Sequence, residues 1–480
     1  MRRGGPLAAL EALGNRLPDP AVLFMLVALI VVAVSAALAG VTVTHPLTHE
    51  PVAVQSLMEA APLRRMWTDA VKNFAAFPPL GGVLVAVMGI GVAERSGFIA
   101  AGLGQAVRRV PPAALTVAML FVCANAALAS DASFVVFVPL GAVLWARAGR
   151  HPLAGLTIAY AAVSGGYGAN LLVTALDPLL AGLTESAARL VRSDAHVAAT
   201  CNWFFNAASV GVVTLGGALV APAVERRFGP WSAPPEAEEV AVEARLGPAL
   251  LALAATLALL ALIARFILRA DDGSWTPVYD SIVPMVAVAA LVPGLVYAVD
   301  AGKVRSTADA ARLASEAAGG MGGYIVLAFF AAQFVAWFNW SNLGVVSAVR
   351  GAEALAALHL GATGLLFAFV VLSAVLNLLL VSASAKWALM APLFVPMFLL
   401  LGVEPAMTQA AYRVGDAFTN PLTPLMPYMP IVIAAARRYD PKVGLGTLLA
   451  AQMPFAVAVG ALWTALLLGW NALGWPLGVG

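Results

Sequence analysis

One short stretch near the end of the chain combines an arginine, a carboxylate and helix-breaking residues. Arg413 and Asp416 lie three residues apart in YRVGDAFTNP (residues 412–421), so on a helix they share a face and can form an ion pair. Gly415 just before the carboxylate, with the Asn-Pro pair after it, predicts that the helix unwinds here. Arg413 can then hold a substrate carboxylate, while Asp416 and freed carbonyls bind Na⁺ or carry a proton. The alternative is an internal ion pair that only fixes helix packing.

A glycine-rich counterpart of this stretch lies in the first half of the chain. A shift of 250 residues places Asn170, at the end of SGGYGAN, on Asn420. Asp177 and Pro178 follow this break. Two interpretations of Asp177 stay open: it caps a following helix, whose first turn suits proline, or it acts on a substrate or a proton.

Two serine-rich breaks interrupt long apolar runs elsewhere in the chain. The first is SDAS at residues 130–133, and the second is SASAKW at residues 382–387. Asp131 and Lys386 are charges at membrane depth that either point into a cavity or cap a half-helix. The serines of both breaks are candidates to line the tips, where the N-termini of half-helices can face an anion. These serines are Ser130, Ser133, Ser382 and Ser384.

Two uncharged side chains near the second serine-rich break are also candidates. Trp387 follows the break directly, where it either stacks on an aromatic ligand or packs at an interface. Asn377 lies about one and a half helical turns before the break, in an apolar run. A buried asparagine either bonds to another helix or ligates an ion.

The breaks occur at matching places in the two halves of the chain. Sliding residues 129–170 along the chain by 253 positions places Pro139 on Pro392 and Pro152 on Pro405. Each copy has a polar break, an apolar arm and a second apolar segment that ends in another break. Broken hydrophobic segments at corresponding places in two halves indicate the substrate site of a transporter.

The composition indicates a membrane protein. Of 480 residues, 61% are hydrophobic and 11% are charged, whereas a soluble chain carries about a quarter charged residues. The net charge is +2 and no basic tract is present, so we expect no nucleic-acid partner. Cys123 and Cys201 sit in or beside apolar segments without metal-ligand spacing, which indicates packing roles. No cofactor is expected, apart from Na⁺ as a possible coupling ion.

The expected fold is an all-α polytopic membrane protein with about nine transmembrane helices and two re-entrant hairpins, arranged as two inverted repeats. An external amphipathic segment is expected at 174–201, and an amphipathic helix along the membrane interface at 343–360. The expected spans are 21–41, 78–94, 152–173, 202–224, 247–268, 282–299, 322–341, 405–436 and 443–470.

The two hairpins are expected in the interrupted runs 113–146 and 361–401. Basic residues flank the first run at both ends, so a hairpin that enters and returns keeps all of them on the cytoplasmic side. By parity the second hairpin enters from the opposite face. A basic leader before the first span places the N-terminus in the cytoplasm.

The chain divides at a polar linker that contains PPEAEE. We expect a first repeat at 1–225 with the hairpin 113–146, a cytoplasmic linker at 226–246, and a second repeat at 247–480 with the hairpin 361–401.

Four segments resemble the AbgT family of p-aminobenzoyl-glutamate transporters. They are GNRLPDPAVLF (14–24), SGGYGANLLVTALDPLLAGLT (164–184), SASAKWALMAPLFVPM (382–397) and YRVGDAFTNPLTPLMPY (412–428). The resemblance implies a homodimer in the bacterial inner membrane that moves aminobenzoyl-glutamate or related folate catabolites, with export of sulfonamide antimetabolites in some members. It also implies residue roles. The substrate-site positions are Asp177, Trp387, Pro405 and Arg413, and the sodium-site positions are Asn377 and Asp416.

The resulting hypothesis is a secondary transporter that works by alternating access and couples a small aromatic carboxylate to Na⁺ or H⁺. A channel on the same repeats remains an alternative, as does a transporter of another carboxylate. An enzyme is not expected, because a Ser384–Lys386 pair stands alone, without GxSxG or HExxH. Membrane lipid, the coupling cation and a second copy of the chain are the expected partners.

Overall fold

The computed structural model describes residues 18, 20–45, 49–108, 110–129, 132–231, 245–271, 273, 275, 277–278, 281–319 and 321–479. The N-terminal leader, Ser130 and Asp131 lie outside the described residues. The architecture is helical apart from one antiparallel pair of short strands, β1 (Thr42–Thr44) and β2 (Pro51–Ala53).

The helices before the linker are α2 (Pro20–Ala37), α3 (Ala60–Thr68), α4 (Ala70–Ala75), α5 (Pro78–Ser96), α6 (Phe98–Arg108), η1 (Pro112–Ala114), α7 (Leu115–Ala124), η2 (Ala126–Ala129), α8 (Ala132–Arg147), α9 (Pro152–Gly165), α10 (Leu176–Ala188) and α11 (Trp203–Phe228). Those after it are α12 (Leu246–Phe266), α14 (Ile282–Asp300), α15 (Thr307–Gly319), α16 (Gly322–Trp340), α17 (Leu343–Ala356), α18 (Gly361–Asn377), α19 (Ala383–Leu400), α20 (Pro405–Thr419), η3 (Asn420–Leu422), α21 (Met429–Arg437) and α22 (Leu445–Leu473).

Seven helices in the described part of the chain are long and apolar enough to cross a membrane. Six of them, α2, α11, α12, α14, α16 and α22, coincide with expected spans, and the seventh, α19, lies in the expected second hairpin. α17 and α18 pass the same test as a pair bent by 111°. The all-α prediction is therefore confirmed, while the count of about nine spans and two hairpins stays a prediction.

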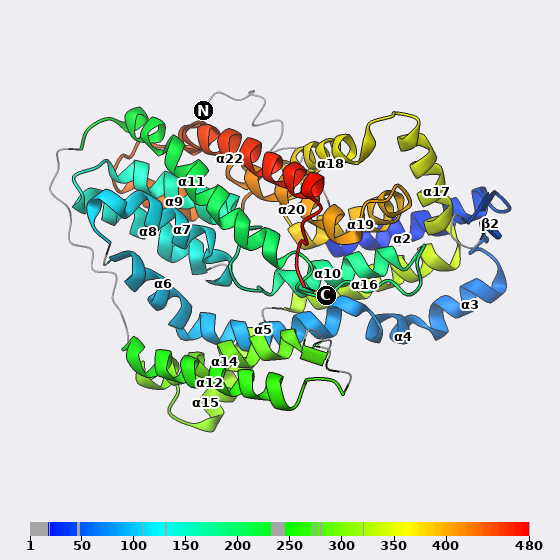
Figure 1. Cartoon of the computed structure of the whole chain (residues 1–480), viewed down its shortest axis with the longest axis horizontal. Coiled ribbons are helices and arrows are strands. Elements are labelled where there is room, and N and C mark those ends of the chain that lie inside the picture. Colours follow the sequence, from blue (N-terminus) through cyan, green and yellow to red (C-terminus); the bar gives the residue numbers. More distant parts are fainter. Residues whose placement is uncertain are drawn as a thin grey trace.

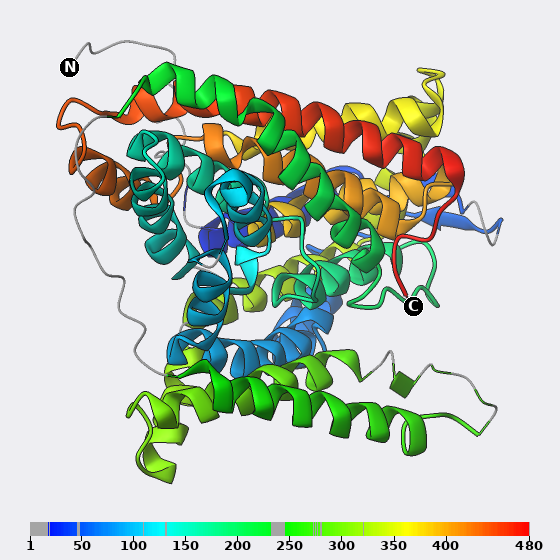
Figure 2. The ribbon, with the colours of Figure 1, turned by 60° about the vertical axis from the view of Figure 1, so that its left-hand side comes forward.

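The helices gather around a centre formed by α10, α18, α19 and α20. α10 contacts α5, α19 and α20, and α18 packs along α20. α11 and α22 pack against each other on one side of this centre, and α12, α14 and α15 lie on the opposite side next to α5 (Figure 1). The turned view separates α12, α14 and α15 as a layer along the lower edge (Figure 2). The four helices of the centre carry the substrate-site and sodium-site positions that the family resemblance implies.

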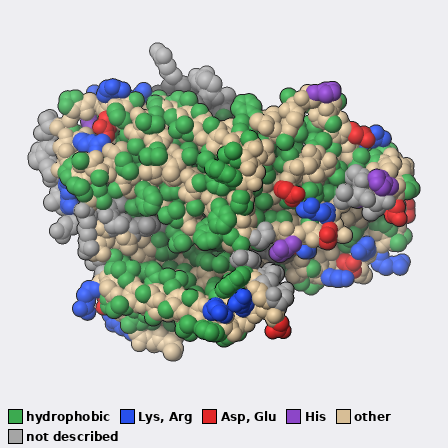
Figure 3. Space-filling model, in the orientation of Figure 1, with side chains coloured by type: hydrophobic (Ala, Val, Ile, Leu, Met, Phe, Trp, Pro, Cys, Tyr) green, Lys and Arg blue, Asp and Glu red, His purple; other side chains and the backbone are tan. Residues whose placement is uncertain are grey.

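The outer surface is largely apolar on the face drawn in Figure 3. Hydrophobic side chains cover most of this face, and many of the charged ones gather toward its two ends (Figure 3). Leu219 on α11 and Leu251 and Phe266 on α12 are each about three-quarters exposed, at 75%, 74% and 74%. Large exposed apolar side chains are what a lipid-facing surface requires.

Two expectations about connecting segments need correction. The expectation of an amphipathic segment at 174–201 is wrong for α10 (Leu176–Ala188), which is buried along almost its whole length between other helices, while its placement outside the membrane stays a prediction. Its polar residues bond to partners within the protein, so they do not mark a solvent-facing side. The linker expected at 226–246 begins later than 226, since α11 continues to Phe228, and 232–244 lie outside the described residues.

Candidate functional site

The two breaks predicted at the ends of 152–173 and within 405–436 lie side by side. α9 ends at Gly165 and α20 ends at Thr419. Asn420 Nδ2 donates to the Ser164 carbonyl at 3.1 Å, across 256 residues of sequence. A Cβ atom on Gly165 would lie 2.9 Å from Cγ of Pro421, so the two breaks are in direct contact. Both broken segments therefore reach one central region, as matched breaks in two halves predict.

A cavity of about 270 Å³ opens beside these breaks, next to the second serine-rich break. Its lining includes Phe134 after the first serine-rich break, Tyr167 in the glycine-rich break, and Asp416 and Asn420 near the end of α20. Residues 382–384 line it from the second serine-rich break. Ser382 caps α19, since its hydroxyl accepts from Ala385 N at 3.4 Å, and Ser133 is buried. Parts of the chain far apart in sequence thus enclose one cavity.

Arg413 pairs across the molecule with Asp177. Arg413 Nη1 lies 2.5 Å from Asp177 Oδ1, and both residues are 3% exposed. The expected pairing of Arg413 with Asp416 is wrong, because α10 brings a carboxylate from the first half of the chain to the guanidinium. Asp177 also reaches back to its own helix entry, where Oδ2 accepts from Thr174 N at 2.6 Å and Thr174 Oγ1 at 2.8 Å. Asp177 lies inside the first turn of α10, whose N-cap is Ala175 without a side-chain hydrogen bond, so the expectation that Asp177 caps this helix is wrong, and its role toward a substrate or a proton stays a prediction.

Asp416 pairs instead with Lys386. Lys386 Nζ lies 2.5 Å from Asp416 Oδ1 and donates to Asn377 Oδ1 at 2.6 Å. Asn377 Nδ2 donates to the Asp416 carbonyl at 2.7 Å, which ties α18 to α20. Tyr412 OH donates to Asp416 Oδ1 at 3.2 Å. The predicted ion ligands Asn377 and Asp416 are therefore adjacent, and a lysine lies between their side-chain oxygens.

The Arg413 guanidinium keeps unused hydrogen-bonding capacity. Its Nε and Nη2 atoms are buried and have no hydrogen-bond partner in the described structure. The side-chain amide oxygen of Asn206 is also buried without a donor in the described structure, and Asn206 Nδ2 lies 3.4 Å from Asp177 Oδ1. Unpaired buried polar groups are costly, so several of them around one ion pair indicate a place where a ligand or water completes the bonding.

Gly415 does not unwind its helix, which corrects a second expectation. α20 continues without interruption to Thr419, and the chain leaves the helix only at Asn420. A Cβ atom at position 415 would lie 2.3 Å from the Val370 carbonyl oxygen and 2.7 Å from Ser373 Cβ. The glycine therefore allows the backbones of α18 and α20 to approach closely, as small residues do where membrane helices cross.

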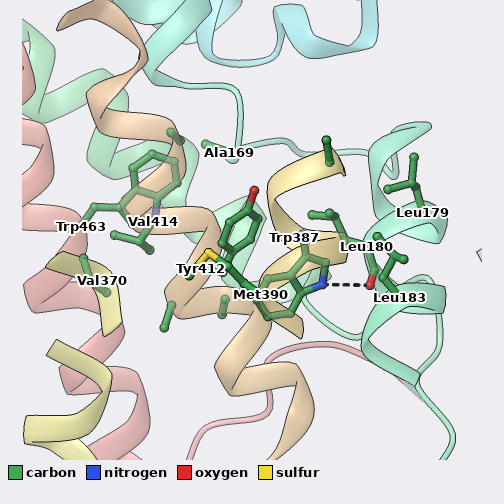
Figure 4. Packing of buried hydrophobic residues seen from close by; sticks show 14 of the residues in the cluster. Ala169, Leu179, Leu180, Leu183, Val370, Trp387, Met390, Tyr412, Val414 and Trp463 are labelled. Carbon is green, nitrogen blue, oxygen red and sulfur yellow. Dashed lines mark hydrogen bonds between the residues drawn. The ribbon is translucent and has the colours of Figure 1, made fainter. Parts of the chain in front are cut away.

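Trp387 is fully buried among protein groups. Its indole ring stacks on Tyr412 with the ring centroids 4.5 Å apart and the planes at 26° (Figure 4). The indole N–H lies 3.0 Å from Thr184 Oγ1. It also lies 3.3 Å from the Leu180 carbonyl of α10, the contact marked by the dashed line in Figure 4. With 0% exposure, the ring has no open face for a ligand in this conformation.

Replacing Trp387 with alanine is expected to destabilise the folded protein by about 3–5 kcal/mol, the usual cost of truncating a buried aromatic. Trp387→Phe should retain most of the stability, because a ring still packs on Tyr412. Thermal unfolding of the detergent-purified variants measures both changes. Equal melting temperatures for Trp387→Ala and the unsubstituted protein would show that the ring is not packed as described.

Pro405 lies apart from the charged pairs. It begins α20, and it lines a second cavity of about 440 Å³ together with Cys201 and Glu404. Asp416 lies 11 residues further along α20, which is about 16 Å at the rise of an α-helix. The structure therefore brings Asp177, Arg413, Asn377 and Asp416 together and places Pro405 at the other end of the helix.

Sequence reasoning missed several polar residues that complete the centre. Thr184, Gln409 and Asn202 form a buried chain, since Thr184 Oγ1 donates to Gln409 Oε1 at 2.5 Å and Gln409 Nε2 donates to Asn202 Oδ1 at 2.8 Å. This chain reaches from Trp387 toward Cys201. Polar residues spaced four apart along apolar helices were an available signal, but the sequence does not reveal their partners.

Comparison with known proteins identifies the family of this chain. The AbgT transporter family model matches residues 6–480. The p-aminobenzoyl-glutamate transport protein of Escherichia coli (strain K12) is 34% identical over 98% of this chain and 95% of its own length. The chain belongs to the AbgT family.

Two solved AbgT-family structures superpose closely on this chain. The YdaH transporter of Alcanivorax borkumensis has a TM-score of 0.93 at 43% identity, covering 96% of this chain and 100% of that one. MtrF of Neisseria gonorrhoeae, described as illuminating a class of antimetabolite efflux pumps, has a TM-score of 0.91 at 37% identity, covering 99% of each chain. This AbgT-family member is therefore a multi-pass membrane transporter and not an enzyme.

Proposed function

We propose that this AbgT-family protein is a secondary transporter of the bacterial inner membrane that moves p-aminobenzoyl-glutamate or a related aromatic carboxylate, driven by Na⁺ or H⁺. The carboxylate binds at Arg413, and alternating access proceeds around the central cavity. The proposal includes a homodimer with cytoplasmic N-termini and two inverted repeats, 1–225 and 247–480, joined by a cytoplasmic linker.

The observation that carries this proposal is the incompletely bonded Arg413. One guanidinium nitrogen pairs with Asp177, and the buried Nε and Nη2 atoms have no hydrogen-bond partner among the described residues. A guanidinium offers parallel N–H groups that match a carboxylate in a bidentate contact. Leu176, the residue before Asp177, lines the central cavity, whereas Arg413 and Asp177 lie behind its wall, so a ligand that reaches the guanidinium has to enter deeper than this cavity. The name of the Escherichia coli relative supports p-aminobenzoyl-glutamate as the first substrate to test.

Charge balance supports coupling to a cation. The centre holds two cations, Arg413 and Lys386, and two carboxylates, Asp177 and Asp416, so its formal charge is zero. A carboxylate ligand that enters alone leaves this buried region negative, and unpaired charge in a low-dielectric environment is costly. Each Na⁺ ion or proton that binds at Asp416 offsets one negative charge of the ligand. Asn377 supplies the neighbouring oxygen for such an ion.

Counterflow in proteoliposomes tests the proposal. Vesicles loaded with unlabelled p-aminobenzoyl-glutamate should accumulate the labelled compound transiently, and the rate should saturate with substrate. Net uptake should respond to a Na⁺ or a pH gradient, which identifies the coupling ion. Flux that rises linearly with concentration and shows no counterflow would favour a channel instead. Counterflow with other carboxylates but not with p-aminobenzoyl-glutamate would show that the protein is a transporter with a different substrate.

A further inference from the structure

We propose that the Lys386 ammonium is a tethered cation that occupies the coupling-ion site, and that Na⁺ binds Asp416 and Asn377 only by displacing it. This inference rests on the proposed cation coupling. It assigns a role to a residue that otherwise looks like half of a structural ion pair. In this role the Lys386 ammonium competes with Na⁺ for the side-chain oxygens of Asp416 and Asn377.

The first support is the identity of the oxygens. Lys386 Nζ contacts Asp416 Oδ1 at 2.5 Å and Asn377 Oδ1 at 2.6 Å, which are the two side-chain oxygens expected to hold Na⁺. Further oxygens lie close by, since Asn377 Nδ2 is 2.8 Å from Asn420 Oδ1 and 3.0 Å from Thr419 Oγ1. Because the ammonium bridges these two oxygens, it occupies the position between them that a metal ion bound to both would take. Na⁺ therefore enters only after the side chain moves away.

The second support is the position of Lys386 in its helix. Ser382 caps α19 and Ala383 begins it, so Lys386 lies in the first turn. The N-terminal end of a helix carries partial positive charge and disfavours a cation. The ammonium is therefore held by Asp416, Asn377 and the ring of Tyr412, whose centroid lies 5.7 Å away, against the field of its own helix. Na⁺, which is not attached to the helix, can therefore replace the Lys386 ammonium at these oxygens.

The displacement links cation binding to anion binding. While Lys386 holds the oxygens, Asp416 is neutralised and the empty carrier keeps a balanced centre. When Na⁺ takes the oxygens, the released ammonium adds one positive charge beside the cavity that residues 382–384 line. That charge favours a carboxylate ligand, so the cation and the substrate bind better together than separately.

The test compares heat stability in NaCl and in choline chloride at equal concentration. Lys386→Met keeps the apolar stem and removes the competing charge, so its stability should depend strongly on Na⁺. The Na⁺ concentration for half-maximal stabilisation should fall about 5- to 150-fold relative to the unsubstituted protein, the range usual for coupled ligands. Lys386→Met/Asp416→Asn removes both charges and should not respond to Na⁺.

Two results would overturn the inference. One is an unchanged Na⁺ midpoint, or no Na⁺ response, in Lys386→Met. The other is a Lys386→Met protein that stays unfolded in NaCl while the double variant folds, because Na⁺ then does not replace the lysine. Neither result decides the proposed function, whose Na⁺ dependence is read from flux through the unsubstituted protein.

Discussion

Arg413→Ala is expected to abolish uptake of p-aminobenzoyl-glutamate by reconstituted protein. Removing one partner of a buried charged contact costs about 2–5 kcal/mol of binding free energy, which is roughly a 30-fold or greater loss of affinity. Arg413→Lys should also transport poorly, since an ammonium cannot reproduce the bidentate contact. Initial uptake rates against substrate concentration measure the loss. Arg350→Ala, at a surface arginine paired with Glu353, is the matched control and should transport normally.

Folding has to be separated from binding in this experiment. Arg413→Ala leaves Asp177 as a buried carboxylate without its cation, which alone costs about 3–5 kcal/mol of stability. The variant Asp177→Asn/Arg413→Gln replaces the pair with neutral groups and should fold at close to the normal melting temperature. It should still fail to transport, because the guanidinium is gone. Near-normal flux in this folded double variant would remove Arg413 from the substrate site.

The order of the helices could be predicted from the sequence because hydrophobic length sets it. A bilayer needs about 20 apolar residues per span, and the runs at 247–268 and 282–299 have that length. α12 and α14 match them within a few residues. α10 shows where this reasoning stops. Its polar residues suggest a solvent-facing side, but they bond to α19 and α20 inside the protein.

The partners within the site could not be predicted, because sequence spacing describes only one helix at a time. Arg413 and Asp416 share a face of α20, and this made their mutual pairing the natural expectation. Each instead meets an opposite charge from another helix, Asp177 across 236 residues and Lys386 from α19. The sequence does predict that Lys386 pairs with a carboxylate, because an unpaired lysine deep in an apolar segment is energetically costly. Which carboxylate it finds depends on the tertiary packing.

The role of Gly415 was mispredicted for a related reason. Glycine before a polar Asn-Pro pair is typical of a helix that unwinds, yet glycine also marks a close backbone contact. Only the position of α18 decides between these readings. The Val370 carbonyl lies where a Cβ atom of residue 415 would be, so the packing reading is the correct one.

Gly415→Ala is therefore expected to lower stability, opposite to the effect of alanine in an ordinary helix. Helix propensity alone predicts a gain of about 0.5–1 kcal/mol. The added Cβ atom would lie 2.3 Å from the Val370 carbonyl oxygen, and backbone atoms cannot rotate away. Forcing α18 from α20 costs about 1–3 kcal/mol, the usual penalty for overpacking. The shift also draws Asn377 away from Asp416, so uptake should fall along with the melting temperature.

Gly211→Ala provides the matched control for this prediction. Gly211 lies within α11, and a Cβ atom there would have nothing within 4 Å. Its melting temperature should stay level or rise, because only the propensity term applies. The sign of the difference between the two variants then measures the helix contact and not the general effect of alanine. A higher melting temperature in both variants would show that α18 and α20 are not in contact at Gly415. It would also contradict the described contact between Asn377 and Asp416.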